Sequence, residues 1–165
     1  MSISRNELES NNQRLIAKLI LDYVSIEIKS VFPIFISSAT RTDNKFSRHF
    51  KTVKSALDFR PGFDLSEKQR LEILAKYFDY LYKNQTKIND YLKNVLKTKL
   101  YLGIGIATLD YPKGLHLHVD LRNTNSNVFF FETGQGIKSE NVFPLEFEKL
   151  YKANIDKNFV LVKKK

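Results

Sequence analysis

The stretch "GLHLHVDLR", residues 114–122, indicates the fold because its side chains alternate strictly between apolar and polar. Such alternation is typical of a β-strand, in which successive side chains point to opposite faces of the sheet. One face carries Leu115, Leu117, Val119 and Leu121. The other face carries His116, His118, Asp120 and Arg122. The strand is therefore expected to pack one face on the core and to present two of the chain's three histidines together on the other.

Four further segments have the composition of strands, being short, apolar and rich in β-branched or aromatic residues. They are "VFPIFISS" (31–38), "SALDFRP" (55–61), "YLGIGIATL" (101–109) and "NVFFFE" (127–132). The polar and basic residues 39–55 between the first two predict a long loop. Together these segments predict a small, mostly antiparallel sheet.

Helices are predicted on either side of the strands. Ser4 and Glu7 have capping-box spacing and precede a helical apolar period, which predicts a first helix to about residue 30. A second helical region is predicted over about residues 65–98, with a break at 84–86 and with Asp64 or Ser66 as its N-cap.

The tail adds a short predicted helix in "FPLEFEKLYKA" (143–153). Helices that flank a small sheet make the fold class α+β.

Composition limits the class of protein without assigning a function. The 165 residues fit one domain, have no cysteine and contain no apolar run of the length that a membrane span needs. The first residues lack the basic-then-apolar layout of a cleavable signal peptide, so synthesis in the cytoplasm is expected. A net charge of +9 favours polyanionic partners, either nucleic acid or an anionic cell wall.

The third histidine lies upstream in "SRHFKTVKSALD" (47–58), which offers His49 and Asp58. Two imidazoles and a carboxylate form a common ligand set for zinc, and three protein ligands leave a fourth position for water. His49, Asp58 and one histidine of the strand at 114–122 would supply that set. The alternative is a loop histidine and a turn aspartate with no metal role.

The order of motifs along the chain resembles that of the zinc D-alanyl-D-alanine carboxypeptidases and murein endopeptidases of the M15 group. The segments that carry the resemblance are, in order, "FISSATR", "FSRH", "SALDFRP", a long helix, "LGIGIATLDYP" and "GLHLHVDLR". That family shares its fold with the hedgehog signalling domain. The resemblance covers about residues 30–122, which would form a peptidase-like core in a single domain of residues 1–165. Residues 1–29 would then be an N-terminal helix, and 123–165 a C-terminal extension of strand and helix.

The resemblance implies that His49, Asp58 and His118 are the three zinc ligands. The family motif is a tight His-x-x-Gly-x-Ala-x-Asp, whereas here Asp58 follows His49 by nine positions and the glycine is absent. Two additional residues therefore have to be accommodated in the loop.

The resemblance also implies residues that would handle the substrate. Arg41 matches the family's arginine that holds a substrate carboxylate, a task that suits a guanidinium fork. Ser47 matches the serine of the family's Ser-x-His segment and is expected near the substrate and the ligands.

The identity of the general base stays open. Several branches of the family have an acidic residue three positions before the last ligand, and here that position is Leu115. The base would then be His116, Asp110 or Asp120, in that order of preference. Asp120 would alternatively orient Arg122 or a histidine ring.

These features predict a zinc-dependent peptidase that cleaves peptidoglycan stem or cross-link peptides. It would act at the cell wall after lysis or as part of a phage particle. One alternative is a non-catalytic structural or binding protein with the same fold. A nucleic-acid-binding domain is less favoured, because Phe78, Phe129 and Phe131 lie at core-like intervals instead of forming a stacking row.

Overall fold

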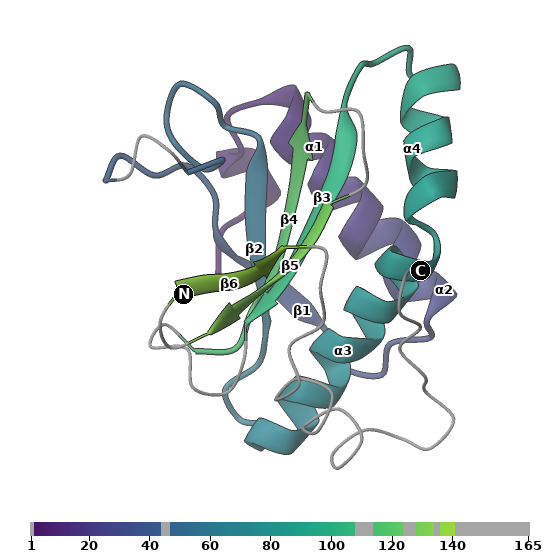
Figure 1. Cartoon of the computed structure of the whole chain (residues 1–165). Helices are drawn as coiled ribbons and strands as arrows, with labels where there is room; N and C mark the ends of the chain where they lie inside the picture. The colour runs from purple at the N-terminus through teal and green to yellow at the C-terminus, as the bar shows by residue number, and fades with distance from the viewer. Residues whose placement is uncertain (1, 44–46, 108–113, 124–127, 134–135, 141–165) are drawn as a thin grey trace.

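The computed structural model describes residues 2–43, 47–107, 114–123, 128–133 and 136–140, with side chains as far as Phe130. Its strands form one sheet with the order β1-β2-β4-β3-β5-β6 (Figure 1). The strands are β1 (Ile34–Ser38), β2 (Ala56–Pro61), β3 (Tyr101–Ala107), β4 (Leu117–Arg122), β5 (Val128–Thr133) and β6 (Gly136–Glu140). Only β3 and β5 run parallel among these neighbouring pairs. The α+β class with a small, mostly antiparallel sheet is therefore confirmed.

β6 was not among the predicted strands. Its sequence "GIKSE" has a single large apolar side chain, so its strand conformation depends on its pairing with β5. The predicted helix at 143–153 lies outside the described residues.

The N-terminal helix begins later than predicted. Ser4 and Glu7 do form a capping box, but it caps the one-turn 3-10 helix η1 (Arg5–Glu7). The longer helix begins after Ser10, whose side chain accepts a hydrogen bond from the Gln13 amide. It consists of α1 (Asn11–Ala17), the π-helical segment η2 (Lys18–Val24) and α2 (Ser25–Glu27).

The second helical region is divided as predicted. α3 (Glu67–Lys83) begins at a capping box between Ser66 and Gln69, and α4 (Gln85–Asn94) follows after Asn84. Ser66, and not Asp64, is thus the N-cap. None of the helices in the described part of the chain is both long and apolar enough to cross a membrane.

The helices cover the apolar face of the sheet, across which the N-terminal helical segment runs diagonally (Figure 1). Leu117, Val119 and Leu121 of β4 are at most 2 % exposed and join side chains of α1 and α3 in one core cluster. The opposite face of β4 is also buried, since His118 is 8 % and Asp120 0 % exposed. The strand therefore has no solvated face, although its alternation is the usual mark of one.

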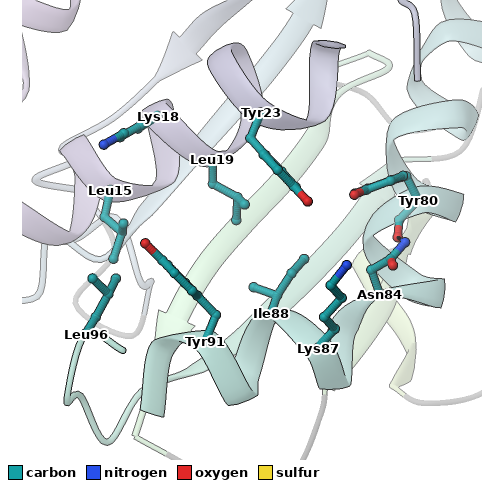
Figure 2. A pocket seen from close by; sticks show the side chains of 10 residues that line it. All are labelled: Leu15, Lys18, Leu19, Tyr23, Tyr80, Asn84, Lys87, Ile88, Tyr91 and Leu96. Atoms are coloured by element: carbon teal, nitrogen blue, oxygen red, sulfur yellow. Dashed lines mark hydrogen bonds between the residues drawn. The ribbon is translucent and has the colours of Figure 1, made fainter. Parts of the chain in front are cut away.

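A cavity of about 390 Å³ lies among the helices (Figure 2). It is lined from the N-terminal helical segment by Leu15, Leu19 and Tyr23, and from α3 and α4 by residues that include Tyr80 and Ile88. The rings of Tyr23 and Tyr80 meet edge to face, with centroids 6.4 Å apart. The cavity shares no residue with the site described below.

Two glycines of β3 make room for the polar face of the sheet. Gly103 lies opposite Asp120 and Gly105 lies opposite His118 in the antiparallel register. A Cβ atom on Gly103 would collide with the Asp120 carboxylate, and one on Gly105 would collide with the ring of Phe130. The glycines of "GIG" are thus required by close packing above β3.

We expect Gly105→Ala to lower the free energy of unfolding by about 1–3 kcal/mol, because the buried Phe130 ring has to move to admit the methyl group. Chemical denaturation of both proteins measures this change. Gly62→Ala is the matched control, since among the described residues its methyl group would meet only the exposed side chain of Asp64. Equal stability of Gly105→Ala and the wild type would contradict the packing argument.

Candidate metal centre

The loop between β1 and β2 holds His49 through its backbone. The Arg41 amide donates to the His49 carbonyl at 2.8 Å, and the Lys51 amide donates to the Arg41 carbonyl at 2.9 Å. The Ser47 Oγ accepts a hydrogen bond from the His49 amide at 3.1 Å. Ser47, which the sequence placed near the substrate, therefore fixes the backbone of a candidate metal ligand.

The long spacing between His49 and Asp58 does not separate their side chains. The Val53 and Lys54 amides both donate to the Phe50 carbonyl, at 2.8 and 2.9 Å, which closes a tight turn. Lys54 has a φ of 45°, in the left-handed region used in such turns. Because the turn takes up the additional residues, His49 Nε2 lies 3.2 Å from Asp58 Oδ1.

The pairing of β2 with β4 brings a third side chain into the group. Asp58 lies directly opposite His118, so both side chains point to the same face of the sheet. His118 Nδ1 lies 3.0 Å from Asp58 Oδ1 and 3.3 Å from His49 Nε2. The three residues are buried and form a group that can hold a metal ion.

The separations within the His49–Asp58–His118 group suit tetrahedral coordination. Ligand atoms about 2.0–2.1 Å from a tetrahedral ion lie about 3.3–3.4 Å from one another. The three observed separations range from 3.0 to 3.3 Å. Movements of a few tenths of an ångström would therefore admit an ion.

In each histidine ring, the hydrogen-bond partner of the nitrogen that points away from the group determines which ring nitrogen carries the hydrogen. His49 Nδ1 lies 2.7 Å from the Ala39 carbonyl oxygen, and His118 Nε2 lies 2.8 Å from Asp120 Oδ2. Since these oxygens only accept, both outer nitrogens carry a hydrogen. In the neutral rings, His49 Nε2 and His118 Nδ1 then direct lone pairs toward each other and toward Asp58 Oδ1. Three converging acceptors require a shared cation or an added proton, and a divalent ion that binds imidazole and carboxylate fits them.

In the metal-free chain the same contacts shift the pKa values of the group. Burial would lower the pKa of His118, but its hydrogen bonds with Asp120 and Asp58 raise it to about 10. Burial would raise the pKa of Asp58, but hydrogen bonds with His118 and His49 hold it well below its usual range. The pKa of Asp120 is also lowered against burial, by its hydrogen bonds with Arg122 and His118. Both carboxylates are therefore ionised at neutral pH.

Arg41 contacts the group directly. Its Nη2 atom lies 2.8 Å from Asp58 Oδ2, and its Nε donates to the Ser38 Oγ at 3.0 Å. This contact engages the Asp58 oxygen that does not face the histidines. Arg41, which the sequence assigned to a substrate carboxylate, thus orients the carboxylate of a candidate ligand.

The three residues considered as general base have different positions. His116 is buried, and its Nδ1 lies 3.0 Å from the Gly114 carbonyl oxygen, outside the group of three. Both oxygens of Asp120 are engaged, Oδ2 by His118 and Oδ1 by Arg122 at 2.7 Å. Asp120 has therefore the alternative role of orienting a histidine ring. Asp110 lies outside the described residues.

Two neighbours of the group were not identified from the sequence. The Ala39 carbonyl that binds His49 is a backbone group, for which a sequence holds no signal. The Phe130 ring packs beside His118 with centroids 5.2 Å apart, over the space that Gly105 leaves open. The continuous apolar run in "NVFFFE" together with the glycines of "GIG" was the available signal for that packing.

In the comparisons with known proteins, the chain matches no family model, no curated protein and no solved structure.

We expect the wild-type chain to bind about one divalent ion such as zinc or cobalt, and Asp58→Asn to bind at least tenfold more weakly. The substitution removes the negative charge on which both histidines converge while it keeps the side-chain volume. Calorimetric titration of the chelator-treated protein measures the affinity. The ion should also raise the melting temperature of the wild type and not that of the variant.

His116→Ala is the control for this experiment, because His116 lies outside the group of three. It should keep the wild-type stoichiometry. Equal metal binding by Asp58→Asn and the wild type would mean that the ligands are other residues.

Proposed function

We propose that the protein is a zinc-dependent peptidase that acts on the peptide stems of peptidoglycan. The observation that carries the proposal is the convergence of His49 Nε2, Asp58 Oδ1 and His118 Nδ1 within 3.3 Å of one another. The order of motifs along the chain supports the same conclusion, since these residues are the ones that the resemblance to the M15 group marks as ligands.

Zinc is the ion that we assign to the group. Two imidazoles and one carboxylate form the ligand set of several catalytic zinc sites, in which a fourth position remains for water. When bound, zinc lowers the pKa of a water molecule to about 7 and polarises a carbonyl group.

The chain's own residues would hold the ligands and handle the proton. The Ala39 carbonyl and Asp120 fix the two histidine rings, and Arg41 fixes the Asp58 carboxylate. We assign the proton transfer to His116, whose Nδ1 donates to the Gly114 carbonyl, so that its Nε2 is the basic nitrogen.

The test is hydrolysis of soluble muropeptides by the zinc-supplemented full chain. We expect release of amino acid or of a shorter stem peptide, detected by mass spectrometry, and its loss in His118→Ala or after chelation. His116→Ala should retain zinc and lower kcat by about 100-fold or more. Zinc binding without cleavage of any muropeptide would contradict the peptidase proposal.

A second candidate is a binding protein that keeps the metal group without catalysis. The observation in its favour is Leu115, which is apolar and 5 % exposed at the position where the resembled family has an acidic base. Zinc-dependent binding of intact muropeptides, with no product after long incubation, would establish this second function.

A further inference from the structure

The cavity among the helices lies apart from the candidate metal group. Its volume of about 390 Å³ is in the range of small-ligand pockets. The N-terminal helical segment, α3 and α4 form it, and these helices cover the apolar face of the sheet, whereas the metal group lies on the opposite face. A ligand bound in this cavity would therefore be a second ligand, and its binding would not depend on the proposed peptidase function.

Apolar side chains form the middle and one end of the cavity. Leu19 of η2 and Ile88 of α4 point toward each other across its middle, and Leu15 and Leu96 lie at the end away from Tyr80 (Figure 2). A methylene group occupies about as much volume as a water molecule in the liquid, about 30 Å³, so the cavity has room for a chain of about ten carbon atoms. Its shape and lining thus suit an extended apolar chain.

The polar groups of the lining gather toward the other end. Lys87 extends from α4 toward Tyr23 and Tyr80, whose hydroxyl groups face each other and share a hydrogen bond (Figure 2). Because two bonded hydroxyl groups use only one of their two hydrogens for each other, the second hydrogen can be donated to a ligand. An ammonium group and a hydroxyl donor at one end of an apolar cavity can receive the oxygen atoms of an anion.

The charges around the cavity favour a negative ligand. The charged residues of its lining are Lys18 and Lys87, and none of the described residues that line it is acidic. Within the described part of the chain, neither lysine forms an ion pair with an acidic side chain. The Asp22 carboxylate, which follows Lys18 by about one turn, is bound by both terminal nitrogens of the Arg5 guanidinium. The lining is therefore complementary to an apolar chain that carries a negative charge.

The wall from the N-terminal helical segment has an uncommon backbone conformation. Lys18, Leu19 and Tyr23 all belong to the π-helical segment η2. At its end the Ser25 amide donates to the Ile20 carbonyl, five residues back, and the Ser25 Oγ donates to the same carbonyl at 3.0 Å. π-Helical turns are rare and frequently occur at functional sites. Here the departure from α-helical geometry coincides with side chains that line the cavity.

We propose that this cavity binds a single-chain carboxylate of the fatty-acid type. The chain lies between Leu19 and Ile88, and the carboxylate binds the Lys87 ammonium group and the hydroxyl pair of Tyr23 and Tyr80. Each methylene group that enters the cavity adds to the affinity, and the charge of Lys87 selects an anionic head group.

The test is calorimetric titration of the full chain with three probes below their micelle concentrations. Decanoate has both the chain and the charge, butyrate lacks most of the chain, and decyltrimethylammonium has the same chain with the opposite charge. We expect about one decanoate per chain, bound at least tenfold more tightly than either of the other probes.

Two variants locate the binding site. Leu19→Trp fills the cavity from a half-buried position and should abolish decanoate binding while the protein stays folded. Lys87→Gln should weaken decanoate binding about fivefold and leave the binding of decyltrimethylammonium no weaker. Lys93→Gln is the matched control, because it removes an exposed lysine of the same helix from outside the lining, and it should bind decanoate as the wild type does.

Asp58→Asn should also bind decanoate with wild-type affinity, because the carboxylate is not held by the metal group. Equal affinity of the wild type for decanoate and butyrate, or for decanoate and decyltrimethylammonium, would overturn the proposal. Undiminished binding by folded Leu19→Trp, or weaker binding by Asp58→Asn, would also overturn it, since decanoate would then bind elsewhere. None of these results depends on peptide cleavage.

Discussion

The Asp58 carboxylate is the group on which the arrangement of the site depends. One oxygen faces both His49 and His118, and the other binds Arg41. Burying such a charge is costly unless several partners compensate it, and here two partners come from the loop between β1 and β2 and one from β4. The same contacts that keep Asp58 ionised place three acceptor atoms at the spacing of a tetrahedral ion. Stability of the buried charge and capacity for a metal ion are therefore two consequences of one geometry.

The two faces of the sheet have different roles, because one supplies the hydrophobic core and the other carries the buried polar groups around Asp58. On the apolar face, residues such as Val119 pack against the helices and supply the hydrophobic stabilisation of the domain. On the other face, the buried Asp120 carboxylate accepts hydrogen bonds from both His118 and Arg122. The glycines of β3 leave the space that this face needs, Gly103 for the Asp120 carboxylate and Gly105 for the Phe130 ring that packs beside His118.

Much of the site was predictable because its ligands belong to regular strands or stand beside them. The alternation in residues 114–122 was sufficient to place His116, His118 and Asp120 on one face, and the motif order related them to His49 and Asp58. The roles of neighbours were less predictable. A side chain such as Arg41 or Ser47 can bind a substrate, a ligand or the backbone, and the choice depends on distances that sequence spacing does not specify.

The sequence by itself determined the α+β class, the divided helix after Ser66 and the strands that carry the candidate ligands, because these follow from local periodicity and capping. Only the tertiary structure decided that the nine-residue spacing before Asp58 still brings His49 to it, because the turn that ends at Lys54 takes up the additional length. The tertiary structure alone also decided that the polar face of β4 is buried and that β3 pairs in parallel with β5. These outcomes depend on contacts between segments distant in sequence, and no local pattern contains them.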